Sequence, residues 1–267
     1  SLRLTEEGVS KTPFIFYSID LTEFVMYNIL GQSDLRISPI GIGGNLLGSC
    51  VEKNEAHEIL SKAQGLGINF IDTANVYGNK KSESIIGDFL RKEQRRDKWV
   101  VATKLGLQKG QSSDFTANKK SIVEGVENSL KKLQTDVIDL YQIHRFDSKT
   151  PPEETFETLN SLAEKGKIKY YGICNFATDQ LKTALNNGAN KNFFVSAQMG
   201  LNLFKRKHLP TTFPLCAHHN IGVLAYGSLA RGVLTDKYLQ EAFPSQSRAQ
   251  LSDSVKPVSY THLRAHE

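Results

Sequence analysis

Short apolar runs alternate with stretches of helical pattern along most of this chain, and this alternation limits its fold more than any other feature. Runs of four to six residues bounded by turn residues are typical of buried strands. Repeated strand–helix units at this pitch predict a parallel sheet covered by helices. The expected strands are Ile40–Gly43, Asn69–Asp72, Trp99–Thr103, Val137–Gln142, Tyr170–Cys174, Phe193–Gln198 and Val223–Tyr226.

Two of the intervening segments carry clear helix signals. The first has apolar residues at spacings of four, four and three, which puts them on one face of a helix: Ile122, Val126, Leu130 and Leu133. The second opens with Thr150-Pro151-Pro152-Glu153, which reads as a capping box with proline at the first helical position. Gly166 would end that helix.

The number of strands leaves two sheet architectures open. A closed barrel needs eight strands, and the sequence indicates seven. An open doubly wound sheet would carry a G-x-G-x-x-G loop after an early strand. Gly41-Ile42-Gly43-Gly44 comes nearest to that motif, but its spacing is wrong, so these glycines are better explained as a turn at a strand end.

Composition excludes several classes of protein. At 267 residues, with 39% hydrophobic and 23% charged residues, the chain can form one large α/β domain or two small ones. The net charge is +5, but the lysines and arginines are scattered among aspartates and glutamates, which argues against nucleic-acid binding. No apolar run approaches the roughly 20 residues that span a membrane. Cys50, Cys174 and Cys216 form neither a disulfide framework nor a zinc motif, which favours a reducing cytoplasm.

The two ends of the chain lack the pattern of its middle. Residues 1–25 have no clear period, whereas the run from Met26 to Ile40 reads as a natural hairpin start, so we expect translation to begin at Met26. Residues 258–267 match the translation of a transposase-type sequencing adapter, and such segments are excluded from fold reasoning. We therefore expect residues 26–257 to be an incomplete barrel from a gene cut before its eighth strand.

Four polar residues stand where an apolar run has just ended: Asp72, Tyr77, Lys104 and His144. If those runs are parallel strands, the four side chains converge at one end of one sheet. A carboxylate, a phenol, an ammonium and an imidazole gathered there are suited to proton transfer. Each residue alone would more often be structural, as an ion pair, a packed aromatic or a hydrogen-bonded core histidine. Their joint position favours catalysis.

The chain resembles an aldo-keto reductase from about Met26 to about Tyr238. The motifs that carry the resemblance occur in the family's order: Asp72-x-Ala-x-x-Tyr-Gly78, the strand end at Lys104, Tyr141-Gln-Ile-His144, Gly172-Ile-Cys-Asn-Phe176 and Tyr226-Gly-Ser-Leu-Ala-Arg-Gly-Val-Leu-Thr235. The resemblance implies an α/β fold, a (β/α)₈ TIM barrel, here with about seven of its eight strands. It also implies reduction of a small-molecule carbonyl by NADPH bound at the C-terminal face.

The resemblance assigns a role to each of the four residues. Tyr77 would donate the proton that the carbonyl oxygen needs. A free tyrosine has a pKa near ~10, and the Lys104 ammonium is expected to lower it by stabilising the phenolate. Asp72 would hold Lys104 in place, and His144 would orient the carbonyl.

The cofactor contacts also follow from the resemblance. Asn175 and Gln198 match residues that bind the nicotinamide carboxamide, and Tyr226 matches the aromatic that stacks on its ring. Cys174 replaces the usual serine beside Asn175. The remaining expected contacts are Gly44 and Asn45 after the first strand, Asp72, the pyrophosphate loop Gly227, Ser228, Leu229 and Arg231, and Lys237.

Several alternatives stay open. The family's clamp for the adenosine 2′-phosphate follows the eighth strand, so NADP rests on family habit and NAD is not excluded. A redox-sensing regulatory subunit of the same fold is an alternative function, although potassium-channel beta subunits commonly replace the histidine found here at His144. An inert relic of the barrel is a third. His218-His219 lacks the strand-end context, so we expect no metal site. The carbonyl substrate and the oligomeric state cannot be read from the sequence.

Overall fold

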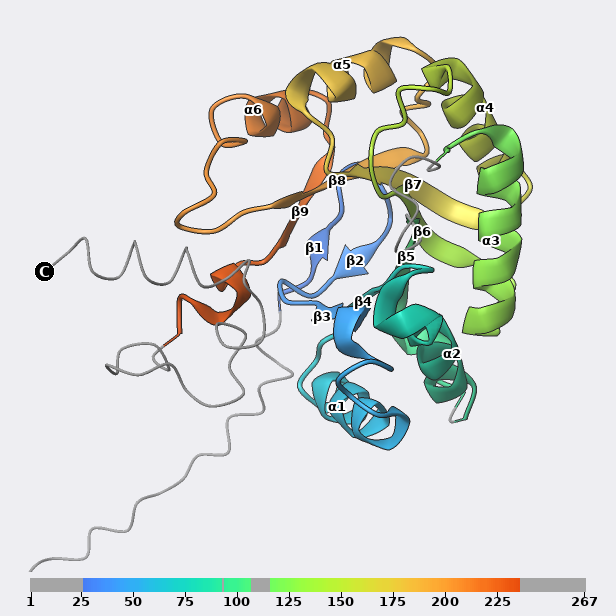
Figure 1. The fold of residues 1–267 in the computed structure, drawn as a ribbon, viewed down its shortest axis with the longest axis vertical. Coiled ribbons are helices and arrows are strands. Elements are labelled where there is room, and N and C mark those ends of the chain that lie inside the picture. Colours follow the sequence, from blue (N-terminus) through green and yellow to red (C-terminus); the bar gives the residue numbers. More distant parts are fainter. Residues whose placement is uncertain (1–25, 93, 107–115, 236–267) are drawn as a thin grey trace, which may run out of the picture.

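A computed structural model describes residues 26–92, 94–106 and 116–235 of the chain. Seven parallel strands form one curled sheet in which the spatial order of the strands is their order in the sequence (Figure 1). Each lies within two residues of its predicted bounds. The strands are β3 (Ile42–Gly43), β4 (Phe70–Asp72), β5 (Val100–Leu105), β6 (Ile138–Ile143), β7 (Ile168–Cys174), β8 (Phe194–Gly200) and β9 (Gly222–Tyr226).

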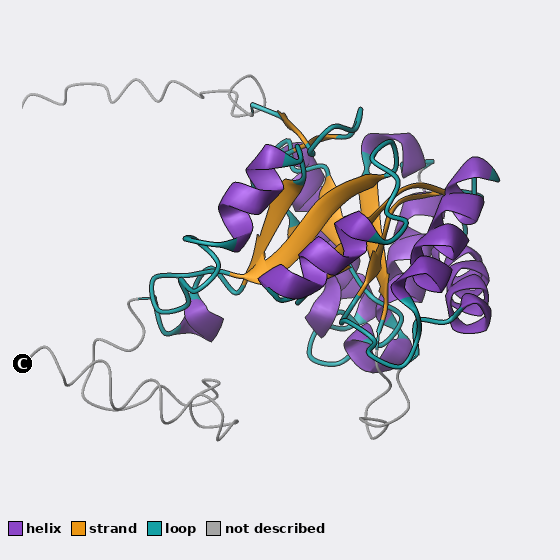
Figure 2. Ribbon diagram, turned by 90° about the horizontal axis from the view of Figure 1, so that it is seen from above, coloured by secondary structure: helices purple, strands orange, loops and turns teal. Residues whose placement is uncertain are grey.

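Helices follow the strands and cover the outer face of the sheet (Figures 1 and 2). The larger apolar core lies between the helices and this face. The fold is therefore the predicted (β/α)₈ barrel architecture, incomplete within the described residues. The helices are α1 (Lys53–Gly65), α2 (Ser82–Lys92), α3 (Lys119–Leu133), α4 (Pro152–Glu164), α5 (Thr178–Asn186) and α6 (Thr212–His218), with short 3₁₀ turns η2 (Gly44–Leu46), η3 (Tyr77–Lys80), η4 (Arg96–Lys98) and η5 (Ala230–Gly232).

The prediction for α3 is confirmed in detail. Its four periodic apolar residues, Ile122, Val126, Leu130 and Leu133, are all buried. Asn118 caps the helix, because its side-chain oxygen accepts a hydrogen bond from the backbone N–H of Ser121 at 2.9 Å.

The predicted capping box of α4 is wrong, although the helix is present. The N-cap is Pro151, and no side chain caps the helix. The helix begins at Pro152, one residue later than the motif predicts, so Thr150 lies before the N-cap. Its hydroxyl donates to Asp147. Gly166 follows the helix with a φ of +69°, which agrees with its predicted role as the stop.

A short antiparallel hairpin closes the end of the barrel at which the strands begin. It consists of β1 (Asn28–Ile29) and β2 (Arg36–Ile37), as the run from Met26 predicted. Leu30 and Leu35 of the hairpin pack in a second apolar cluster with the inward-facing Phe70, Leu140 and Leu224. The lower interior of the barrel is thus a filled core.

The described sheet has two edge strands, β3 and β9. This agrees with the prediction of seven strands with a gap between the first and the last. On β9 the last two residues, Ala225 and Tyr226, are exposed.

Among the described residues, no helix is long and apolar enough to cross a membrane. Residues 1–25, the tail 258–267 and the expected cofactor contact Lys237 lie outside the described residues.

Candidate active site

A buried ion pair stands at the end of β4 and β5. Lys104 is fully buried, and its Nζ lies 2.7 Å from Asp72 Oδ1 and 2.8 Å from Asp72 Oδ2. A third bond, of 2.8 Å, runs from Nζ to the carbonyl oxygen of Thr73. An ammonium has three donors, and these three acceptors match them.

Tyr77 lies beside this pair because the chain turns sharply after it. Gly78 has a φ of +54°, and a Cβ there would lie 1.6 Å from the carbonyl oxygen of Leu47, so only glycine fits. The turn brings the Tyr77 ring centroid to 5.0 Å from Lys104 Nζ. His144, the residue after β6, meets the same ring edge-on at a centroid distance of 5.7 Å. The structure thus brings together all four residues singled out in the sequence.

The electrostatics of Tyr77 differ from the expectation. The pKa of Tyr77 is raised above its ordinary value, first by burial and then by the nearby negative charge of Asp72. We expected Lys104 to lower it. Both carboxylate oxygens of Asp72 bond to the ammonium, so the negative charge of Asp72 partly offsets the positive charge of Lys104 at the tyrosine. In this state Tyr77 holds its proton firmly.

His144 is a neutral imidazole near neutral pH. Burial, and then the positive charges of Lys104 and Arg145, lower its pKa to about 3. Its Nδ1 is buried and has no hydrogen-bond partner among the described residues. A neutral ring donates from one nitrogen and accepts at the other, so it can bind a carbonyl oxygen as a donor.

Four of the expected cofactor contacts form one hydrogen-bonded chain at the ends of β7, β8 and β9. The Tyr226 hydroxyl donates to Asn175 Oδ1 at 2.6 Å. The Asn175 amide donates to Cys174 Sγ at 3.1 Å and to the carbonyl oxygen of His144 at 3.2 Å. Cys174 Sγ in turn donates to Gln198 Oε1 at 3.2 Å. Cys174 therefore keeps the linking role of a serine, and burial raises its thiol pKa to about 12.

This group of side chains fits a nicotinamide. The Tyr226 side chain is 44% exposed, so one end of the site offers an aromatic surface. Asn175 and Gln198 supply amide groups of the kind that pair with a carboxamide. A bound carboxamide would compete with the bond between Tyr226 and Asn175.

Most of the other expected cofactor contacts lie in the loops that follow β3 and β9. Gly227, Ser228, Leu229 and Arg231 form an exposed loop after β9, in which Gly227 has a φ of +66°. Asn45 is exposed after β3. Gly44 is buried, and a Cβ there would lie 2.7 Å from Ser82 Oγ and 3.1 Å from Thr73 Oγ1. Packing by itself therefore accounts for glycine at position 44.

One buried residue at the site was missed by the sequence reasoning. Gln142 Nε2 lies 3.4 Å from Asp72 Oδ1, and the Gln142 side chain is completely buried. The signal was available, because alternate residues of a strand share a face. Gln142 stands two residues before His144 and in register with Lys104.

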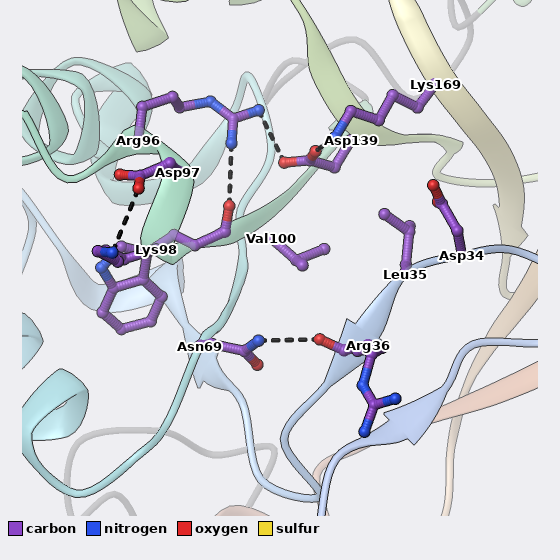
Figure 3. A pocket seen from close by; sticks show the side chains of 11 residues that line it. Asp34, Leu35, Arg36, Asn69, Arg96, Asp97, Lys98, Val100, Asp139 and Lys169 are labelled. Atoms are coloured by element: carbon purple, nitrogen blue, oxygen red, sulfur yellow. Dashed lines mark hydrogen bonds and ion pairs between the residues drawn. The ribbon is translucent and has the colours of Figure 1, made fainter.

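A pocket of about 260 Å³ lies at the opposite end of the barrel, beside the hairpin (Figure 3). Its charged groups are largely paired with one another. Buried Asp139 accepts from Arg96 at 2.7 Å and from Lys169 at 2.8 Å. We interpret this end as a structural ion-pair network, because the candidate catalytic residues stand at the other ends of the strands.

Comparisons with known proteins find similar sequences and folds. A model of the Aldo/keto reductase family matches residues 39–264. The aldo-keto reductase YhdN of Bacillus subtilis is 38% identical over 221 residues, which cover 80% of this chain and 65% of YhdN. A probable voltage-gated potassium channel subunit beta of Arabidopsis thaliana is 35% identical over 86% of this chain and 71% of its own length. The holo form of the aldo-keto reductase AKR11C1 from Bacillus halodurans superposes with a TM-score of 0.72 at 34% identity, covering 81% of this chain and 71% of that one.

Proposed function

This chain belongs to the aldo/keto reductase family, and on that premise we propose that it reduces an aldehyde or ketone to an alcohol with Tyr77 as proton donor. Family membership makes it an oxidoreductase of carbonyl compounds. The observation that carries the finer proposal is the position of Tyr77, whose ring contacts both the Lys104 ammonium and the His144 imidazole.

The chemistry follows from the state of each side chain. A bound nicotinamide dinucleotide supplies the hydride. Hydride addition leaves negative charge on the substrate oxygen, and that oxygen takes the Tyr77 proton. The raised pKa of Tyr77 keeps the hydroxyl protonated until then. As the proton leaves, the phenolate charge develops near Lys104, where the ammonium stabilises it.

His144 and Asp72 act on orientation. Neutral His144 donates a hydrogen bond to the carbonyl oxygen and holds it near Tyr77. Asp72 fixes Lys104 through two hydrogen bonds, so the ammonium cannot turn away from the tyrosine. Both effects lower the barrier by positioning, because the groups do not have to reorganise during the reaction.

We propose NADPH as the cofactor, with NADH as the alternative. Tyr226, Asn175 and Gln198 would hold the nicotinamide, with Cys174 and Asp72 beside them, and the loop from Gly227 to Arg231 would lie along the pyrophosphate. Gly44, Asn45 and Lys237 complete the proposed contacts. The ratio of kcat/KM for NADPH and NADH distinguishes the two dinucleotides.

Replacement of Tyr77 by phenylalanine tests the proton donor. The measurement uses the longest native gene product that carries these residues, NADPH and a panel of aldehydes. Loss of a general acid should lower kcat by roughly 10²–10⁴-fold and leave the Kd for NADPH almost unchanged. Tyr170→Phe, in the lower half of the barrel, is the matched control and should retain normal turnover. A Tyr77→Phe variant with half of the normal kcat would assign the proton to another donor.

A regulatory subunit is the second candidate, favoured by the Arabidopsis relative named as a potassium channel subunit. A protein that binds NADPH but turns over none of the aldehydes would support it.

We also propose a cytoplasmic location, since Cys50, Cys174 and Cys216 are free thiols. Finally, we propose that the 267-residue chain by itself is inactive.

A further inference from the structure

One row of residues crosses four neighbouring strands, starting from Lys104 at the base of the candidate active site. The strand register pairs Lys104 with Gln142, Gln142 with Gly172, and Gly172 with Ser196. Paired residues of a parallel sheet present their side chains on the same face. Because Lys104 and Gln142 both reach Asp72 inside the barrel, Gly172 and Ser196 face the interior as well.

Ser196 reaches the interior through a local irregularity in β8. The register shifts between Tyr171 and Gly172, so that Phe194 pairs with Tyr171 and Ser196 pairs with Gly172. Val195 is the extra residue, and its side chain lies in the inner apolar cluster. A bulge of this kind turns two successive side chains to the same side. The serine hydroxyl is thereby placed among the polar groups of the interior.

Gly172 provides the space that this hydroxyl occupies. A Cβ at position 172 would lie 2.1 Å from Ser196 Oγ and 2.7 Å from the carbonyl oxygen of Ser196. No side chain can therefore stand between Gln142 and Ser196 in the row. The residues on both sides of the glycine are polar and buried.

Both neighbours of Gly172 carry a buried polar atom without a protein partner in the part of the chain that the structure describes. These atoms are Gln142 Oε1 and Ser196 Oγ. A buried polar atom is normally hydrogen-bonded, because leaving it unpaired costs free energy. An internal water commonly bridges such groups when two or more polar partners are available.

We propose that Gln142 and Ser196 bind one buried water molecule between them, and that this water fixes the Gln142 amide so that it positions Asp72 against Lys104. The water donates to Gln142 Oε1 and exchanges a hydrogen bond with the Ser196 hydroxyl. The Gln142 NH₂ group then remains directed at Asp72 Oδ1. With Oε1 unpaired, the amide could turn over and set its oxygen against the carboxylate.

This inference rests on the proposed function, because its consequence for turnover passes through Asp72, Lys104 and Tyr77. Gln142 and Ser196 are positioning residues in it, since neither touches a reacting atom. A positioning role predicts a fall in kcat with little change in the KM for the carbonyl or in the Kd for NADPH. General loss of packing would instead appear as reduced stability with unchanged kcat for the folded fraction.

The test uses the longest native gene product and two variants, Ser196→Ala and Ser129→Ala. Ser129 is the matched control, because its hydroxyl is also buried and unpartnered but lies on α3, outside the barrel interior. A high-resolution crystal structure should contain a water within hydrogen-bond distance of Gln142 Oε1 and Ser196 Oγ, and Ser196→Ala should lose it. We expect kcat to fall roughly tenfold in Ser196→Ala, on the order of one hydrogen bond to a charged group, and to stay unchanged in Ser129→Ala.

Three results would overturn the inference. The first is a crystal structure without that water, including one in which Ser196 Oγ bonds directly to Gln142 Oε1. The second is a water that is present but a Ser196→Ala variant whose kcat equals that of the wild type. The third is an equal fall in kcat for both variants, which would show that the loss is not specific to this row of residues. A wild-type protein without reductase activity would refute the proposed function instead, and the crystal structure would still test the water site.

Discussion

Replacing Asp72 by asparagine should destabilise this protein far more than the loss of an ordinary ion pair. The change keeps the size of the side chain and removes the negative charge. Lys104 is completely buried and gives two of its three hydrogen bonds to Asp72. Its ammonium would then be left in the interior with no opposite charge beside it.

The expected cost follows from the burial of the two partners. Breaking a buried ion pair by removing one charge costs about 3–5 kcal/mol. The Asp72 side chain is 16% exposed, so water relieves part of the penalty and the lower end of that range applies. A loss of about 3 kcal/mol is a large share of a typical unfolding free energy of roughly 5–15 kcal/mol.

Urea unfolding at pH 7, followed by far-ultraviolet circular dichroism, measures this difference. Glu127→Gln is the matched control, since it removes the same charge from a pair with Lys167 at 3.2 Å whose side chains are 51% and 43% exposed. Exposed pairs of this kind contribute about 0–1 kcal/mol. A double variant with Lys104→Met and Asp72→Asn should recover part of the stability, because it removes the uncompensated charge.

The reasoning would be refuted by an Asp72→Asn variant whose loss of stability matches that of Glu127→Gln. Such a result would mean that water reaches Lys104 or that Thr73 alone satisfies it. A double variant less stable than Asp72→Asn would contradict the argument as well, because it would show that packing of the lysine stem outweighs its charge.

Three further predictions follow from particular residues. His144 takes up a proton on unfolding, because its folded pKa of about 3 lies below its unfolded value near ~6.5. The unfolding free energy should therefore fall by up to ~1.4 kcal/mol per pH unit as the pH drops from about 6.5 towards 3. His144→Gln should flatten this pH profile measured by urea unfolding, and an unchanged slope would contradict the burial of the ring. Gly78→Ala should lower the unfolding free energy several times more than Gly166→Ala. Both glycines have a positive φ, but only at Gly78 would a Cβ meet backbone, 1.6 Å from the Leu47 carbonyl oxygen. Equal losses of stability in thermal unfolding would rule this out. The 267-residue chain as it stands should aggregate, bind NADPH poorly and reduce no carbonyl, because β3 and β9 are unpaired edges in the described sheet. A soluble monomer that binds NADPH with micromolar affinity in a fluorescence titration would disprove this.

The seven strands and the apolar face of α3 could be predicted from the sequence because their signals are local. Burial of one face imposes a period on neighbouring residues, and that period can be read without knowing what covers the face. The convergence of Asp72, Tyr77, Lys104 and His144 followed from the same reading, since the carboxyl ends of parallel strands meet at one end of a barrel. The predicted cap at Thr150 failed because the helix begins one residue later, with Pro151 as its N-cap, while the Thr150 hydroxyl donates to Asp147. The local motif does not encode that start.

Only the tertiary structure decided the electrostatics and the fine register of the site. The direction of the Tyr77 pKa shift depends on which charge lies nearer and how far water is excluded, and both come from chain segments far apart in the sequence. The bulge at Val195 breaks the two-residue period of β8, so the sequence alone gives no sign that Val195 and Ser196 both face the interior. Fold class therefore follows from local periodicity, whereas protonation states and hydrogen-bond partners depend on distances and burial that exist only once the strands have assembled.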